Sequence, residues 1–190
     1  MLIEDLLGNH RTDQAHAFRS IRTSCSQFID ESAGLPLFRQ LPISYADVHR
    51  VKVRAKKRSS VVGEAFNKAF EQNYTNISQR AVFATPSKQY SDPTHEPFYI
   101  FPINGFRFIY SKEVSESTSG YQQVMNTIVE QLKDEQAASK LVSDLLKFSY
   151  TSVNLYEGIN SNCEIILYGI PYYYAVRCSA YPEYQQIISA

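Results

Sequence analysis

Apolar and polar positions alternate along the chain with two periods, one of three to four residues and one of two residues. Residues 12–34 carry apolar side chains at helical spacing, and Thr12 or Asp13 can cap the start of this segment. Helical spacing returns in residues 61–74 and over the long stretch 120–150. These three segments are predicted to be amphipathic helices.

Short apolar and aromatic runs between these segments predict β-strands. One strand of about five residues is expected between Pro36 and Pro42, because a proline bounds the run on each side. Residues 80–87 form another, residues 96–111 form two strands around a Pro-Ile-Asn-Gly turn, and residues 163–177 form a closing strand pair. Helices interleaved with short strands indicate an α+β fold with flanking helices.

A further strand, beginning near residue 50, has one wholly basic face. Val51, Val53 and Ala55 alternate with basic residues, which predicts a half-buried strand. Six bases and no acid fall in this stretch, a density that suits contact with phosphate or nucleic acid. The alternative is an edge strand that its lysines keep soluble. The six residues are Arg50, Lys52, Arg54, Lys56, Lys57 and Arg58.

Composition bounds the class of protein. The chain has 190 residues, 44% of them apolar, so we expect a single domain over 1–190, with an N-terminal helical part at 1–34 and a core at 35–177. Nineteen basic and nineteen acidic side chains balance, which argues against a surface built entirely for nucleic acid or anionic lipid.

Cysteine usage and the terminal sequence indicate the compartment. Three widely spaced cysteines without a Cys-x-x-Cys pair indicate neither a disulfide framework nor a zinc site, so no metal is expected. No signal peptide and no membrane-spanning apolar run can be read. A cytoplasmic protein without membrane contact is the expectation.

Several reaction classes lose support because their motifs are missing. The chain has no P-loop, no Rossmann Gly-x-Gly-x-x-Gly, no His-Glu-x-x-His and no Gly-x-Ser-x-Gly. Three features remain: Arg39 in "LFRQL", Thr85 and Ser87 in "FATPS", and Glu164 in "NCEIIL". A charge within an apolar strand is costly unless it is paired or faces a ligand. The alternative is that Arg39 and Glu164 are exposed strand-end charges or partners in a structural salt bridge.

These features, in this order, resemble the ADP-ribosyltransferase-like family, in the class whose motifs are arginine, serine or threonine, and glutamate. "LFRQ" resembles the early arginine strand, "FATPS" the middle strand end, and "NCEIIL" the late glutamate strand, so that the resemblance covers about residues 35–177. The run 80–114 also resembles a pattern that recurs in bacteriophage proteins. Gln40, Pro86 and Asn162 depart from the family pattern, where a glycine, an uninterrupted Ser-Thr-Ser and a Glu or Gln are usual.

The resemblance implies a fold in which short-stranded mixed sheets form a central cleft, and it implies NAD as the substrate. Arg39 would hold the pyrophosphate, because a guanidinium can bind it through two parallel hydrogen bonds. Glu164 would be catalytic, stabilising positive charge on the ribose. The remaining assignments follow from the same family. Thr85 and Ser87 would support the carboxylate or touch the ribose, Tyr90 and Phe98 would stack on nicotinamide or else pack in the core, and Asn162 would lie on the acceptor side.

The function expected from this resemblance is a phage-encoded, NAD-dependent ADP-ribosyltransferase that takes part in host takeover in the host-cell cytoplasm. Its acceptor would be a host macromolecule, either a protein or a nucleic acid, with the basic strand contacting phosphate of NAD or of the acceptor. Two alternatives stay open. One is a non-catalytic nucleic-acid- or protein-binding module on the same fold, and the other is a virion accessory protein.

Overall fold

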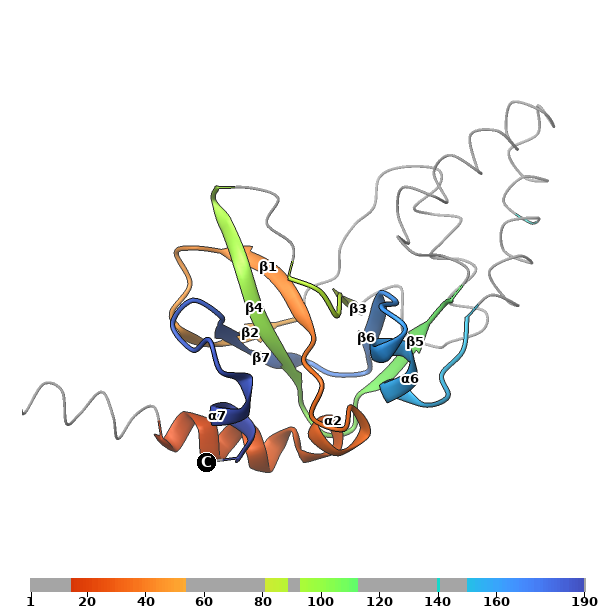
Figure 1. The fold of residues 1–190 in the computed structure, drawn as a ribbon, viewed down its shortest axis with the longest axis horizontal. Helices are drawn as coiled ribbons and strands as arrows, with labels where there is room; N and C mark the ends of the chain where they lie inside the picture. The colour runs from red at the N-terminus through yellow and green to blue at the C-terminus, as the bar shows by residue number, and fades with distance from the viewer. Residues whose placement is uncertain (1–14, 54–80, 89–92, 113–139, 141–149, 190) are drawn as a thin grey trace, which may run out of the picture.

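The strands form two small antiparallel sheets accompanied by short helices, a mixed α+β arrangement (Figure 1). The computed structural model describes residues 15–53, 81–88, 93–112, 140 and 150–189. The expected helix at 61–74 lies outside the described residues, as does nearly all of the expected stretch 120–150. Within the described ranges, no helix has the length and apolarity needed to cross a membrane.

The larger sheet, sheet A, has four strands in the order β1-β4-β7-β2. They are β1 (Phe38–Pro42), β4 (His95–Pro102), β7 (Tyr172–Arg177) and β2 (Val48–Lys52). The last six residues of β4 are all buried, as expected for a strand with partners on both edges. Strand β1 confirms the strand predicted between the two prolines, and β2 confirms the start of the basic strand.

The smaller sheet, sheet B, has the order β3-β6-β5. It consists of β3 (Ala81–Ala84), β6 (Ile165–Tyr168) and β5 (Arg107–Tyr110). All four residues of β6 are buried, so this central strand is a continuous apolar run without alternation. One backbone pair joins the two sheets: Phe38 of β1 and Thr85, just after β3, exchange hydrogen bonds of 2.7 and 2.9 Å.

Two strand pairs that are neighbours in sequence turn out to lie in different sheets, which corrects the predicted local pairing. Strands β4 and β5 flank the turn at Gly105 but belong to sheets A and B, and β6 and β7 separate in the same way at Gly169. Both glycines have a left-handed backbone, with φ of 87° and 82°. Strand β4 instead pairs with β1 and β7, and β6 pairs with β3 and β5, so that both edges of each of these two strands are covered.

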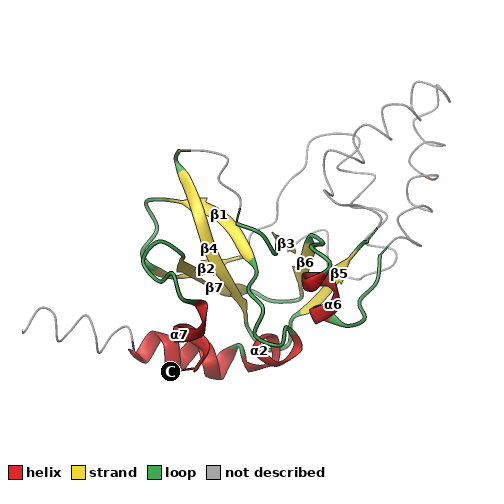
Figure 2. Ribbon diagram, viewed as in Figure 1, coloured by secondary structure: helices red, strands yellow, loops and turns green. Residues whose placement is uncertain are grey.

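Helices cover one face of sheet A (Figure 2). They are the helical residues 15–24, α2 (Ser26–Glu31) and α7 (Tyr184–Ser189). The Phe101 ring of β4 stacks on Tyr184 at 5.4 Å and meets Phe28 edge-on at 6.2 Å. Aromatic contacts between helices and sheet therefore form the centre of the core.

Helix α6 (Leu155–Asn160) accompanies sheet B and lies between the expected helical stretch 120–150 and the expected strand pair 163–177, where the sequence pattern predicts neither a helix nor a strand. Its Gly158 lies so close to the ring of Tyr110 that an added Cβ would be 2.7 Å from that ring. The Asn154 side chain caps the helix by accepting a hydrogen bond from the Glu157 amide at 3.2 Å. An asparagine three residues before a glutamate was the available signal for this helix start.

Candidate functional site

Arg39 lies in β1 with a half-buried side chain. Its neighbours Phe38 and Leu41 are buried at 6% exposure each, so the strand is anchored on both sides of the arginine. The guanidinium donates to the Phe83 carbonyl of β3 at 3.4 Å. One edge of Arg39 is thereby fixed to the neighbouring strand segment, which limits the positions of its remaining donors.

Thr85 and Ser87 lie immediately beyond the end of β3. The Thr85 hydroxyl donates to the Ser87 carbonyl at 3.0 Å, which closes a local turn around Pro86. The backbone pair with Phe38 fixes Thr85 beside the strand that carries Arg39. Pro86, a departure from the family pattern, thus shapes the turn that presents Ser87 at the surface.

A small pocket lies where these segments meet. Its volume is about 90 Å³, and its lining consists of Phe38, Arg39, Gln40, Phe83, Thr85 and Ser87. The structure therefore brings together three of the sequence-predicted residues, Arg39, Thr85 and Ser87. A pocket for a whole drug-sized ligand is usually at least ~300 Å³. This pocket suits one phosphate-sized group with the rest of a ligand outside it.

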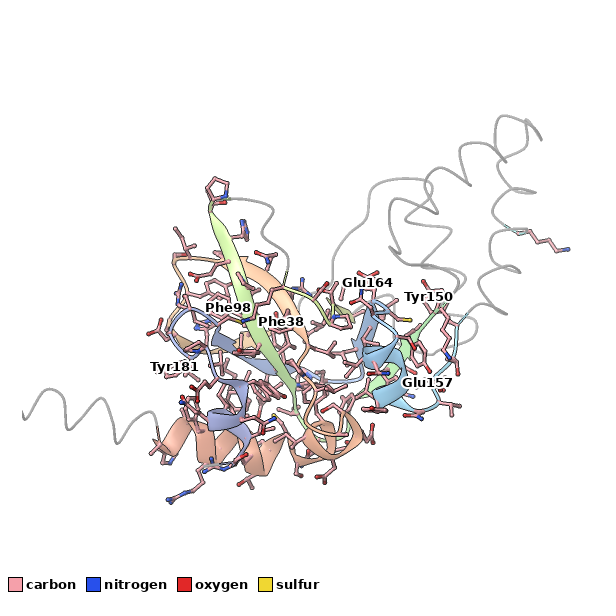
Figure 3. All side chains as sticks on the ribbon, in the orientation of Figure 1. Phe38, Phe98, Tyr150, Glu157, Glu164 and Tyr181 are labelled. Carbon is pink, nitrogen blue, oxygen red and sulfur yellow. The ribbon has the colours of Figure 1, made fainter. Side chains whose placement is uncertain are left out.

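Glu164 is the residue that immediately precedes β6, and its side chain is half-buried. The last residue pair between β3 and β6 is Ala84 with Ile165, so Thr85 and Glu164 are the next residues of these two segments, at the same end of the sheet. Figure 3 shows Glu164 at this end of β6. Glu164 does not line the pocket; it lies across β3 from the strand of Arg39.

The end of α6 determines how the chain reaches Glu164. Asn162 has φ of 56°, its amide donates to the Ile159 carbonyl at 3.0 Å, and the Cys163 amide donates to Gly158 at 3.1 Å. This is a Schellman motif, in which asparagine is the commonest residue after glycine at the left-handed position. The left-handed conformation at the end of α6 therefore explains why residue 162 is an asparagine. The prediction that Asn162 lies on the acceptor side is not needed to explain it.

Phe98 and Tyr90 are the two aromatic residues predicted to lie near nicotinamide, and the structure describes one of them. Phe98 has 0% exposure and lies under the Arg177 guanidinium at 5.0 Å, so the structure accounts for it as a core residue without a free face. Tyr90 lies outside the described residues.

Of the six bases of the basic strand, the structure describes two. Arg50 and Lys52 are exposed on β2, the last strand of sheet A. Lys52 is paired across the sheet with Tyr172, whose ring also lies under the Arg50 guanidinium at 4.4 Å. Arg54, Lys56, Lys57 and Arg58 fall outside the described residues.

Two groups near the site were not singled out from the sequence. Burial raises the pKa of the Tyr173 phenol, while Arg39 lowers it, which places this buried ring within electrostatic range of the guanidinium. Burial also raises the pKa of Cys163, the neighbour of Glu164, against the opposing effect of Lys112. Tyr173 gives no sequence signal because it reads as one of several strand tyrosines.

Lys112 and Glu157 form an ion pair beside Cys163. The hydrogen bond to Glu157 raises the pKa of Lys112. Among the described residues, no three His, Cys, Asp or Glu side chains are grouped so that they could hold a metal ion.

Comparison of the chain with models of protein families, with curated proteins and with solved structures gives no significant match. The family suggested by the motifs therefore stays a prediction.

Proposed function

We propose that the protein is an NAD-dependent ADP-ribosyltransferase. The observation that supports this function most is the adjacency of β1, β3 and β6, with Arg39 in β1, Thr85 directly after β3 and Glu164 directly before β6. In this proposal the two sheets and their helices have the ADP-ribosyltransferase-like arrangement, and the junction between the sheets is the NAD site.

Arg39 would bind the pyrophosphate of NAD. Its guanidinium stays charged at every relevant pH and offers paired donors to phosphate oxygens. The pocket of about 90 Å³ that it lines with Thr85 and Ser87 fits one phosphate group, and the Ser87 hydroxyl can donate a further hydrogen bond to it. The nucleoside parts of NAD would lie outside this pocket, along the junction.

Glu164 would act at the ribose that carries nicotinamide. The bond between the ribose C1′ and the nicotinamide nitrogen breaks, and its electron pair leaves with nicotinamide as the ring becomes neutral. The positive charge that develops on the ribose is stabilised by a nearby carboxylate. A nucleophilic atom of the acceptor then bonds to C1′ and loses its proton. The resemblance to bacteriophage sequences favours a host protein or nucleic acid as this acceptor.

The test is nicotinamide release from NAD, together with transfer of labelled ADP-ribose in a host lysate, for the wild type and Glu164→Gln. We expect Glu164→Gln to lose turnover by about a hundredfold or more, because an amide does not stabilise a developing cation as a carboxylate does. The fold should be retained, since the substitution keeps the shape of the side chain.

The matched control is Glu183→Gln, which makes the same change at an exposed acid beside α7. This variant should keep wild-type turnover. Equal turnover in Glu164→Gln and wild type would remove Glu164 from the proposal, and no nicotinamide release by the wild type in any lysate would overturn the proposed activity.

A further inference from the structure

Two arginine–tyrosine stacks flank the connection between β6 and β7. The Arg50 guanidinium carbon lies 4.4 Å from the centre of the Tyr172 ring, and that of Arg107 lies 4.9 Å from the centre of the Tyr168 ring. Both distances are within the range of cation–π contact. Tyr168 ends β6 and Tyr172 begins β7, so the two stacks are separated by only a short connection.

The stack on Tyr172 belongs to a larger patch at the edge of sheet A. In the β2–β7 pair, Arg50 is opposite Tyr174 and Lys52 is opposite Tyr172, so these four side chains share one face. The two tyrosine rings meet edge-on at 5.9 Å and are half-buried, whereas the two bases are exposed. Bases therefore lie over and beside partly accessible rings.

This region is locally basic although the chain as a whole is neutral. Segments 48–53, 103–110 and 165–177 contain four Lys and Arg residues and no Asp or Glu. Among the described residues, Arg177 is the one of these four that pairs with acids, namely Asp47 and Glu96. Within the described ranges, Arg50, Lys52 and Arg107 have no acidic partner, so they present positive charge next to tyrosine rings.

We propose that the arginine–tyrosine surface on the β2–β7 pair, formed by Arg50, Lys52 and the rings of Tyr172 and Tyr174, binds single-stranded nucleic acid. Its bases would contact phosphates, and its rings and guanidinium planes would stack on unpaired nucleobases. A duplex offers no free base faces along its length to such a surface, and an anionic lipid headgroup offers no aromatic ring to stack. An acidic peptide offers such a ring only where it carries an aromatic side chain. Positive charge next to aromatic rings therefore favours single-stranded nucleic acid as the ligand of this surface.

The surface shares no residue with the pocket around Arg39, and the inference goes beyond the proposed transferase activity. Glu164→Gln, which should lose transferase turnover, should bind oligonucleotides as the wild type does. Failure of either proposal therefore leaves the other standing.

The test measures fluorescence anisotropy of labelled oligothymidylate, oligouridylate and a DNA duplex of the same length, with the full chain at increasing salt. We expect both single strands to bind more tightly than the duplex, with log affinity falling as log salt rises. Arg50→Gln should reduce the salt slope by about 0.7, the value for one lost phosphate contact on a single strand.

The matched control for charge is Arg19→Gln, because Arg19 is also an exposed arginine and is not one of the four residues that form this surface. It should bind as wild type does. For stacking, Tyr172→Leu should weaken binding about tenfold, while Tyr172→Phe, which keeps the ring, should bind normally. Thermal unfolding of each variant checks the fold.

Equal losses in Arg50→Gln and Arg19→Gln would overturn the proposed surface. Equal binding of duplex and single strand, or of heparin and single strand, would show attraction by charge alone and would overturn recognition of unpaired bases. Binding of neither oligonucleotide at low salt would overturn the whole proposal.

Discussion

Arg39 and Arg177 are both strand arginines with little exposed surface, yet their surroundings differ. Arg177 is 14% exposed, pairs with Asp47 and Glu96, and donates to the carbonyls of Ile43 and Tyr45. Among the described residues, Arg39 donates to one carbonyl, that of Phe83, and it lines the pocket. Saturated donors indicate a structural clamp, whereas a guanidinium with donors left for the pocket is available to a ligand.

The buried thiol of Cys25 should make the stability of the protein depend on pH in the alkaline range. Its side chain has 0% exposure, and burial raises its pKa from 9.0 to about 12. Above pH 9 the unfolded chain loses this proton and the folded chain keeps it, so the free energy of unfolding falls as pH rises. One such group contributes about 1.4 kcal/mol per pH unit until the folded thiol also ionises.

Urea denaturation from about pH 8 to about pH 10.5 measures this effect. The Cys25→Ala variant lacks the thiol, so its stability should fall less steeply above pH 9, while the two curves run parallel at lower pH. Parallel curves over the whole range would show that Cys25 does not titrate in this way.

For single residues, the sequence shows which side chains are chemically unusual more clearly than it shows where those side chains lie in the fold. Arg39 stands out because a charge within an apolar strand is costly, and Thr85 and Ser87 stand out through the resemblance of "FATPS" to a family motif. All three line one pocket. Phe98 shows the opposite case, because an aromatic in a strand looks the same whether it faces a ligand or the core. Its burial depends on Arg177, distant in sequence and invisible to any local pattern.

At the level of elements, the stability of α6 depends on the close packing of this helix against sheet B. Replacement of Gly158 by alanine would put a Cβ within 2.9 Å of three atoms of the Tyr110 ring. That ring is 1% exposed and is held by a hydrogen bond from its hydroxyl to the Val153 carbonyl at 3.0 Å, so it has little freedom to move. We expect Gly158→Ala to lower the free energy of unfolding by about 1–3 kcal/mol.

Chemical denaturation tests this expectation, with Asn160→Ala as the comparison. Asn160 is an exposed residue of the same helix, so its replacement should change stability by no more than about 0.5 kcal/mol. A Gly158→Ala variant as stable as Asn160→Ala would show that the helix can shift away from Tyr110.

The strands of the described ranges lie where the sequence predicts them, whereas the pairing predicted between adjacent strands is wrong. The helices at 61–74 and 120–150 stay predictions, because they fall outside or almost outside the described residues. β1, β3 and β4 appear where the patterns place them. Adjacent strands usually form hairpins, but here the chain passes from one sheet to the other at Gly105 and Gly169. A turn glycine permits both outcomes, so the choice is made by long-range burial of β4 and β6.

For the whole molecule, the helices on sheet A contribute buried side chains to the hydrophobic core, which the strands alone would leave exposed. Ile187 of α7 has 0% exposure, and its carbonyl accepts a bond from Arg22 of the N-terminal helix at 3.4 Å. Ile187→Ala should lower the free energy of unfolding by about 2–5 kcal/mol, because it leaves a cavity in this core.

Ile188→Ala is the matched control, because this neighbouring isoleucine is only partly buried. It should cost clearly less than Ile187→Ala in the same denaturation experiment. Equal losses in the two variants would mean that α7 contributes through its presence as a helix and not through the buried position of Ile187.

The α+β class could be read from the sequence, because the two periodicities alternate along the chain. The division into two sheets could not. It rests on contacts such as Phe38 with Thr85, which lie far apart in sequence and carry no local signature.

The Phe38–Thr85 pair also makes the junction between the sheets observable by hydrogen exchange. Both backbone amides of the pair donate across it, Phe38 to Thr85 at 2.7 Å and Thr85 to Phe38 at 2.9 Å. An amide exchanges with deuterium only when such a bond opens. The exchange rates of these two amides therefore report how often the sheets separate, and a ligand that spans the junction would slow both of them together.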